Sequence, residues 1–178
     1  MLFTRRGDDG NSSLFGTKER WSKDSPIYGA LGTLDELNSL LGVCRAEAVN
    51  IAPTEINVAG ELIRAQECLF IAQAELAGAD KSLGPEQVAE LESVVNQIEK
   101  LVGNPQAFII SGATLLAALL DYARAVSRRA ERAVIAAKDH RAVSPATRAY
   151  LNRLSSLLYA LARYAARAGG VAESSPKY

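Results

Sequence analysis

"YGALGTLDELNSLLGVC", residues 28–44, is the stretch that decides the fold. Apolar side chains recur in it every three or four residues, at Leu31, Leu34, Leu37, Leu41 and Cys44. Side chains at this spacing share one face of an α-helix, and that face must be buried against another element. The stretch therefore predicts a long amphipathic helix over about residues 27–48.

Four further helical segments are predicted on the C-terminal side. Their bounds follow from proline in a first turn, an N-cap hydroxyl and glycine after the last turn. They run from after Pro53 to about Gly78, from Pro85 to before Gly103, from about Thr114 to Asp139, and from Ser144 and Pro145 to before Gly169. The expected buried face of the second helix comprises Ile56, Leu62, Ile63, Leu69, Phe70 and Leu76.

Five long helices joined by short links predict an all-α fold, an antiparallel five-helix bundle. The chain has 178 residues, a length that suits one domain. Within that single domain, we expect a glycine-rich ligand-binding loop over residues 1–25, the bundle over 26–168 and a flexible tail over 169–178.

Composition excludes several classes of protein. The formal net charge is zero, whereas nucleic-acid binders usually carry excess Lys and Arg. No apolar run approaches the roughly 20 residues of a membrane span, and no secretory signal is visible, so we expect a cytoplasmic protein. Cys44 and Cys68 are expected to be buried thiols, and the single histidine, His140, argues against a zinc site.

An arginine stripe interrupts the ordinary pattern in "LLDYARAVSRRAERAV", residues 119–134. Arg124, Arg128 and Arg132 recur every four residues and so share one face of the predicted helix. The stripe fits two interpretations: a solvated face with weak ion pairs, or an anion site that uses the planar donor fork of arginine. The residues of this helix alone leave both open.

The opening segment "TRRGDDGNSSLFGTKERWSKD", residues 4–24, has no helical period. Its glycines allow close backbone approach, and its exposed N–H groups, the hydroxyls of Thr4, Ser12 and Ser13, and the ammonium of Lys23 are donors for phosphate oxygens. The Walker A pattern is absent, so the loop alone is weak support for nucleotide binding. Together with the arginine stripe it favours a polyphosphate site.

Five blocks carry a resemblance to a known family: "TRRGDDGNSSLFG", "SKD", "YGALGTLDELNSLLG", "ARAVSRRAER" and "YLNRLSSLLYALAR". They span nearly the whole chain, and together they resemble the PduO-type ATP:cob(I)alamin adenosyltransferases. The resemblance implies a homotrimeric five-helix bundle that binds ATP, with Mg²⁺ held through the ATP phosphates, and a corrinoid between neighbouring subunits. It implies no metal ligands from the protein itself.

The resemblance also implies roles for individual residues. The expected ATP-binding residues are Thr4, Arg5, Arg6, Gly7, Ser12, Ser13, Lys23, Arg128, Arg129, Glu131, Arg132 and Asn152. The expected catalytic residues are Arg128, Arg132 and Asp35, with Asp35 resembling an acid that pairs with the arginine at Arg128. The expected corrinoid-binding residues are Phe108, Arg124 and Asp121, with Phe108 resembling an aromatic that excludes the lower axial ligand.

Two departures from the family pattern lie on the expected corrinoid side. The family often has Pro-Gly-Gly where this chain has Ser111-Gly112-Ala113, and His where this chain has Asp121. These differences keep alternatives open: a non-catalytic bundle that binds ATP and a corrinoid as a sensor or cofactor chaperone, or another ATP-dependent transferase. For the enzyme we expect small-molecule substrates. A reductase and an adenosylcobalamin-dependent enzyme are expected as further partners in the transfer of the corrinoid.

Overall fold

The structure, a computed structural model, describes residues 3–49 and 55–178. Five helices account for most of it: α1 (Pro26–Ala48), α2 (Val58–Ala77), α3 (Pro85–Val102), α4 (Leu115–Ala136) and α5 (Pro145–Ala168). Two short strands, β1 (Asn11–Ser12) and β2 (Trp21–Ser22), lie in the opening loop. The predicted all-α five-helix bundle is confirmed, while Pro53, the expected start of the second helix, lies outside the described residues.

Local chemistry explains where several of these helices begin. Asn57, Thr114 and Ser144 each accept a hydrogen bond from a backbone N–H in the first turn of α2, α4 and α5. Such side-chain caps satisfy donors that the helix itself leaves free. Gly78 ends α2 in the left-handed region, with φ of 101°, which glycine adopts without a steric cost.

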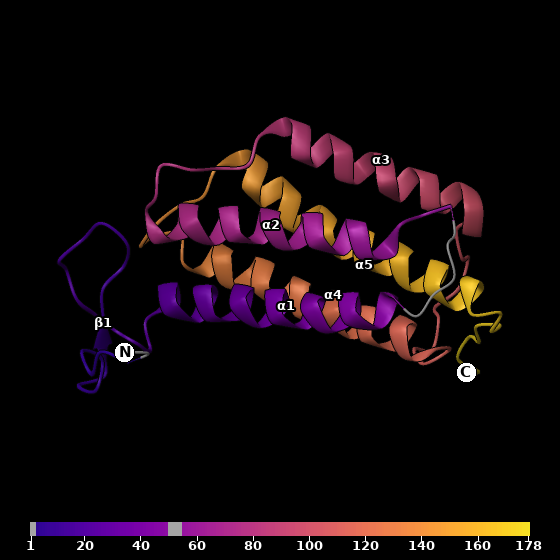
Figure 1. Cartoon of the computed structure of the whole chain (residues 1–178), viewed down its shortest axis with the longest axis horizontal. Helices are drawn as coiled ribbons and strands as arrows, with labels where there is room; N and C mark the ends of the chain where they lie inside the picture. Colours follow the sequence, from indigo (N-terminus) through magenta and orange to yellow (C-terminus); the bar gives the residue numbers. More distant parts are fainter. Residues whose placement is uncertain (1–2, 50–54) are drawn as a thin grey trace.

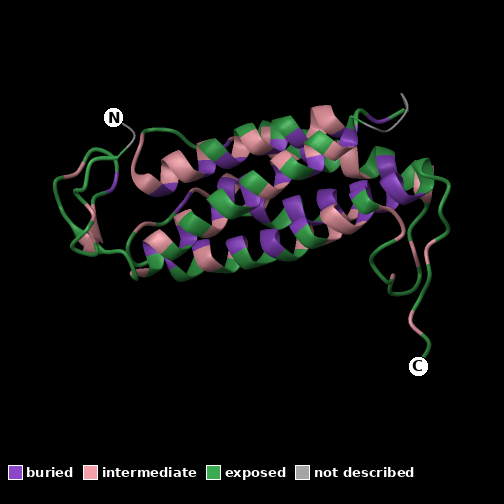
Figure 2. Cartoon of the chain, turned by 60° about the horizontal axis from the view of Figure 1, so that its bottom comes forward, coloured by how far each residue is buried: buried purple, intermediate pink, exposed green. Residues whose placement is uncertain are grey.

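Successive helices run antiparallel, so that the two ends of the bundle differ (Figure 1). The opening loop lies at the end where α1, α3 and α5 begin, and the C-terminal tail lies at the other end with the connector between α3 and α4. Helix α4 packs against α1 and α5, α2 packs mainly against α1, and α3 packs against α5. Figure 2 shows the buried residues along the inner faces and the loop projecting beyond them.

The expected stripe of α1 forms part of the core. Leu34, Leu37, Leu41 and Cys44 are buried completely, and Leu31 is partly buried. Burial raises the pKa of the Cys44 thiol to about 11, so it stays protonated and unreactive at neutral pH. Cys44 and Cys68 are both free thiols, and Cys44 is buried as predicted, whereas Cys68 is only partly buried.

The prediction for the buried face of α2 is wrong at two positions. Ile63 is 42% exposed and Phe70 is 62% exposed. Helix α2 lies at the side of the bundle and packs mainly on α1, so it buries only a narrow stripe. That stripe comprises Val58, Leu62, Ala65, Leu69, Ala72 and Leu76.

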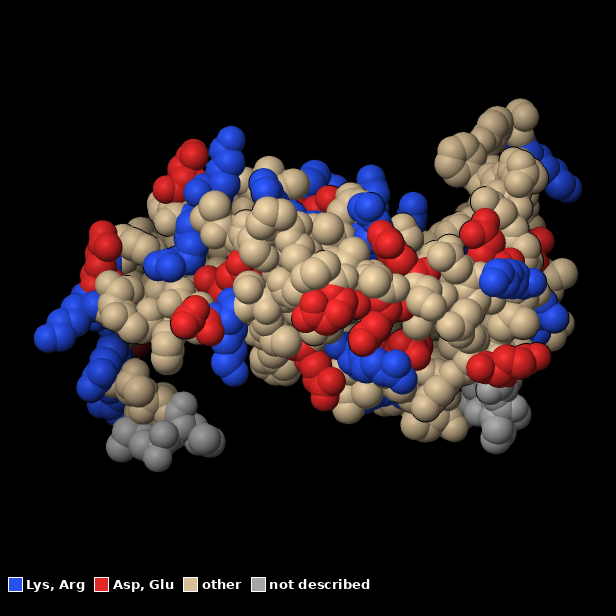
Figure 3. Space-filling model, turned by 90° about the horizontal axis from the view of Figure 1, so that it is seen from above, with Lys and Arg blue, Asp and Glu red and all other residues tan. Residues whose placement is uncertain are grey.

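The surface of the bundle is mixed in charge. Figure 3 looks onto the face that α3 forms and shows Lys and Arg interspersed with Asp and Glu. Within the described residues, no helix is long and apolar enough to cross a membrane.

Candidate functional site

The opening loop is a folded structure that extends from one end of the bundle (Figure 2). Its strands β1 and β2 pair antiparallel, with Asn11 opposite Ser22 and Ser12 opposite Trp21. Gly10 and Gly16 have φ of 79° and 72°, which side chains with a Cβ rarely adopt. The Trp21 ring lies 6.0 Å from that of His140, so the ribbon touches the turn that follows α4.

The loop encloses a cavity of about 550 Å³. The cavity brings together all seven loop residues predicted to bind ATP and three others; it is lined by Thr4, Arg5, Arg6, Gly7, Asp8, Asn11, Ser12, Ser13, Arg20 and Lys23. Four of these side chains are cationic and one is acidic, so the cavity suits an anion. Hydroxyls and a basic rim are the donors that a polyphosphate needs.

Lys23 closes the loop on itself in this structure. Its Nζ donates a hydrogen bond to the backbone oxygen of Gly7 at 2.6 Å. A Cβ at Gly7 would lie 2.7 Å from that Nζ, so any other residue would displace the ammonium. Gly7 therefore sets the approach of Lys23 to the cavity.

Arg20 is a residue of this cavity that the sequence analysis missed. Its Nη2 donates to the Arg6 oxygen at 2.8 Å, to Asp9 Oδ1 at 2.7 Å and to the Asn11 oxygen at 3.1 Å. One guanidinium thus contacts three residues of the segment 6–11. The available signal was its position, an arginine three residues before Lys23 in a loop already rich in phosphate-binding side chains.

Replacing Arg20 with alanine is expected to weaken ATP binding about tenfold or more, since a charged donor that orders the loop is lost. Isothermal titration with Mg-ATP measures this effect. Lys18→Ala is the matched control, because Lys18 is an exposed cation of the same loop and does not line the cavity. Equal weakening in both variants would show that only net loop charge matters.

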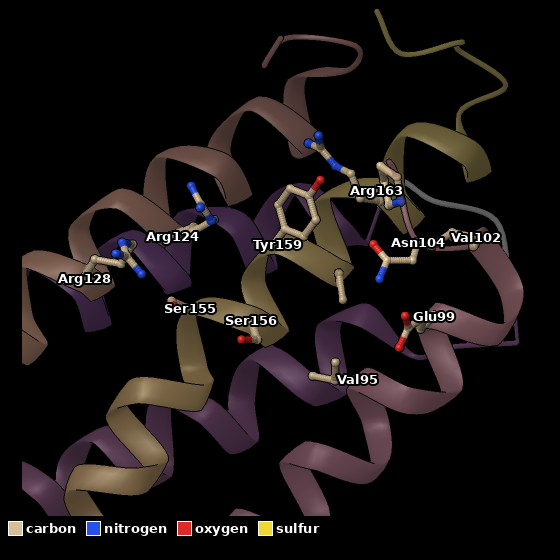
Figure 4. Close-up of a pocket in the computed structure, with 13 residues that line it drawn as sticks. Val95, Glu99, Val102, Asn104, Arg124, Arg128, Ser155, Ser156, Tyr159 and Arg163 are labelled. Atoms are coloured by element: carbon tan, nitrogen blue, oxygen red, sulfur yellow. The ribbon is translucent and has the colours of Figure 1, made fainter. Parts of the chain in front are cut away.

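Two arginines of the stripe line a second cavity, of about 320 Å³, between α3, α4 and α5 (Figure 4). Arg124 and Arg128 enter it from α4, and Tyr159 and Arg163 from α5. The guanidinium carbons of Arg124 and Arg163 lie 5.5 Å and 4.9 Å from the centre of the Tyr159 ring. Cation–π contacts of this kind fix the arginine side chains at the cavity wall.

Two further predicted ATP-binding residues meet across the contact of α4 and α5. Asn152 Nδ2 donates to Glu131 Oε1 at 2.8 Å, and its Oδ1 accepts from Arg153 Nη1 at 2.9 Å. Arg153 continues the network to Glu92 of α3, with Nε 2.9 Å from Oε1. The network orients the Asn152 amide and leaves it exposed at the surface.

The acids at the centre of α1 behave differently from one another. Glu36 forms an ion pair with Arg129 of α4. Asp35 is exposed, and among the described residues its side chain has no hydrogen bond or ion pair. The pairing of Asp35 with Arg128 is therefore not formed within this chain, and Arg132 is likewise exposed without a partner in the described ranges.

Of the expected corrinoid-binding residues, Phe108 and Asp121 lie toward the end opposite the loop, and Arg124 lies near the middle of α4. Phe108, in the connector between α3 and α4, is 77% exposed. Asp121 has its carboxylate paired with Arg163, and its side chain is only 10% exposed. Asp121 is thus part of an internal ion pair, whereas Phe108 is free to touch a ligand.

The two cavities share no residue, and Arg132 lines neither of them. One chain therefore holds two basic part-sites, at the loop and along α4. In the described part of the chain, no group of three His, Cys, Asp or Glu side chains could hold a metal ion.

Comparisons with known proteins place the chain in a family. A family model described as cobalamin adenosyltransferase matches residues 2–165. The chain is 37% identical to a corrinoid adenosyltransferase of Citrobacter freundii over 91% of its own length and 93% of that protein. It is also 37% identical to corrinoid adenosyltransferase PduO of the same organism but spans only 49% of it. Corrinoid adenosyltransferase MMAB of Homo sapiens is 32% identical over 95% of the chain and 70% of its own length.

Solved structures extend the comparison to the fold. A variant PduO-type ATP:corrinoid adenosyltransferase from Lactobacillus reuteri, complexed with cobalamin and ATP, superposes with a TM-score of 0.90 at 28% identity. The match covers 99% of this chain and 97% of that one. Because the family model covers nearly the whole chain and the bundle agrees throughout, the protein belongs to the cobalamin adenosyltransferase family.

Proposed function

We propose that this protein transfers the 5′-deoxyadenosyl group of ATP to the Co(I) of a reduced corrinoid, forming adenosylcobalamin and releasing triphosphate. The observation that carries the proposal is the match, over 99% of the chain, to a structure complexed with cobalamin and ATP. Relatives that are 37% and 32% identical to the chain are named corrinoid adenosyltransferases.

The residues suit this reaction because its main electrostatic demand is the leaving group. Co(I) in a corrinoid is a strong nucleophile, so no general base is required. Triphosphate leaves with a high negative charge, which preorganised donors and cations stabilise. The loop cavity supplies Arg5, Arg6, Arg20 and Lys23 for that purpose. Mg²⁺ would be held by the phosphates and would neutralise part of their charge.

We assign the corrinoid to the α4 side of the molecule. Arg124 lines the cavity between α3, α4 and α5, and the exposed Phe108 lies at the same end of the bundle. Phe108 would occupy the space of the lower axial ligand, which favours four-coordinate cobalt. Asp121 acts there through its ion pair with Arg163.

The complete site is proposed to form between two copies of the chain in a homotrimer. The loop cavity and the α4 cavity are separate within one chain. Asp35 and Arg132 are exposed on neighbouring helices without partners among the described residues. A second copy would bring its loop to the first copy's arginine stripe and its arginine to Asp35.

An anaerobic assay tests the activity. The protein is mixed with Mg-ATP and chemically reduced cobalamin, and the corrinoid spectrum is followed. Conversion to adenosylcobalamin with release of triphosphate is expected. ATP binding without conversion would instead support a sensor or cofactor chaperone, and the proposed reaction would be wrong.

Replacing Asp35 with asparagine is expected to weaken both assembly and ATP turnover, since an arginine of the neighbouring copy would lose its carboxylate. Sedimentation velocity and steady-state kinetics measure the two effects. Glu36→Gln is the matched control for assembly, because Glu36 is the next acid on α1 and its partner Arg129 belongs to the same chain. Unchanged assembly and turnover in the Asp35 variant would remove this contact from the proposal.

The substrates also define the neighbouring reactions. A corrinoid reaches the site as Co(I) only if a reductase supplies the electron, and the product serves an adenosylcobalamin-dependent enzyme. We place the reaction and these two partners in the cytoplasm.

A further inference from the structure

Arg163 is a buried arginine that forms ion pairs with two carboxylates. Its side chain is 3% exposed, with Nη2 2.5 Å from Asp121 Oδ2 and Nε 3.1 Å from Glu173 Oε1. Asp121 belongs to α4, Arg163 to α5 and Glu173 to the C-terminal tail. The ion triad therefore fixes a point of the tail to the contact between two helices.

The residue after Glu173 holds the connector between α3 and α4. The Ser174 backbone oxygen accepts a hydrogen bond from the Ile110 N–H at 2.8 Å. Among the described residues, this is the one backbone–backbone hydrogen bond of the segment 104–113. Glu173 and Ser174 thus connect the buried arginine on one side to the Phe108 segment on the other.

The connector needs such an external support. Residues 104–113 form no helix or strand, and Gly112 has φ of 120°, which residues with a Cβ rarely adopt. Phe108 is 77% exposed, so its side chain does not hold its own backbone in place by packing. An aromatic ring that must crowd one face of a corrinoid has to be positioned by the backbone that carries it.

We propose that Glu173 is a positioning residue for Phe108. By docking on Arg163, Glu173 places the Ser174 oxygen where it accepts the hydrogen bond from the Ile110 N–H. This contact fixes the position of the connector that carries Phe108. The inference rests on the proposed function, and it assigns to the C-terminal tail a role in how the corrinoid is held.

The charges around the tail carboxyl of Glu173 act in opposite directions. Burial raises the pKa of the Glu173 carboxyl, and the nearby Arg163 offsets only part of that rise while Asp121 adds to it. The short distance carries the docking of the tail, since Glu173 Oε1 lies 3.1 Å from Arg163 Nε. Arg163 also lies over Tyr159, a wall of the cavity, so the tail anchor and the cavity share one arginine.

Glu173→Ala tests the proposal, with Lys177→Ala as the matched control. Lys177 is an exposed charge of the same tail that lines neither cavity. Amide hydrogen exchange of Ile110 is expected to quicken about tenfold or more in the Glu173 variant and to stay unchanged in the Lys177 variant. Thermal unfolding of both variants shows that the bundle remains folded.

The functional readout separates positioning from general damage. With cobalamin, whose lower ligand Phe108 must displace, Glu173→Ala is expected to slow adenosylation about tenfold and to lower the four-coordinate cob(II)alamin signal. With cobinamide, which lacks that ligand, the rate should match the wild type, and Mg-ATP binding should be unchanged. Phe108→Ala should show the same discrimination between the two corrinoids.

Several results would overturn the proposal. Wild-type exchange at Ile110 in the Glu173 variant would show that the tail does not hold the connector. The positioning role would also be wrong if amide exchange at Ile110 became faster in the Glu173 variant while cobalamin and cobinamide were adenosylated at wild-type rates, or at rates lowered by the same factor. If the wild-type protein converts neither corrinoid, the proposed function fails, whereas the exchange measurement still decides whether Glu173 holds the connector.

Discussion

Replacing Arg132 with alanine is expected to lower kcat by about 100- to 1,000-fold, which corresponds to roughly 3–4 kcal/mol of transition-state stabilisation. Arg132 is exposed on α4, and its side chain has no partner among the described residues. Its positive charge is therefore available to the triphosphate, whose negative charge grows as the carbon–oxygen bond breaks. A charge contact that becomes desolvated in the assembled site is worth far more than a surface ion pair.

The measurement is anaerobic steady-state kinetics with saturating reduced cobalamin and varied Mg-ATP. Lys138→Ala is the control, since Lys138 is an exposed cation in the turn that follows α4 and lines neither cavity. It removes one positive charge from the same region and should leave kcat unchanged. Wild-type turnover in the Arg132 variant would exclude this residue from the site.

Replacing Arg163 with alanine is expected to lower the free energy of unfolding by about 3–5 kcal/mol. The change would leave the carboxylates of Asp121 and Glu173 buried without their shared counterion. Domains are stable by only about 5–15 kcal/mol, so the loss would be a large part of the total. Urea denaturation followed by far-UV circular dichroism gives the shift in midpoint.

Arg153 provides the matched control on the same helix. It pairs with Glu92 at 2.9 Å, but the side chains of the two residues are 45% and 47% exposed. Exposed pairs contribute about 1 kcal/mol or less, so Arg153→Ala should change the free energy of unfolding by no more than that. Similar losses of unfolding free energy in both variants would show that the buried ion pairs of Arg163 stabilise the protein no more than an exposed pair does.

The helices could be predicted because their signals are local. Proline at Pro85 and Pro145 starts α3 and α5, the Ser144 side chain caps α5, and Gly78 ends α2. The stripe of α1 is buried as expected because α1 packs against both α2 and α4. The exposed Ile63 and Phe70 of α2 were not predictable this way, since the width of a buried stripe depends on how many helices cover it.

The candidate site was predictable only in part. The seven loop residues predicted to bind ATP all line one cavity, and Glu131 meets Asn152 across two helices. That these residues bind ATP stays a prediction. By contrast, Asp121 is internal to an ion pair, and the pair joining α1 to α4 is formed by Glu36 and Arg129.

The sequence by itself determined the five helices, most of their ends and the concentration of cationic and hydroxyl side chains in the first 25 residues, because spacing and capping act over a few neighbouring residues. It missed the start of α2, which begins at Val58 and not directly after Pro53, and the end of α4, which ends at Ala136 and not at Asp139. Only the tertiary structure decided the role of Arg20 and the joining of Asp121, Arg163 and Glu173. The last three lie 42 and 10 residues apart along the chain, and no local pattern connects them. Their contact follows from the packing of α4 on α5 and from the return of the tail toward the connector, since a charge buried there needs a partner from wherever the fold supplies one.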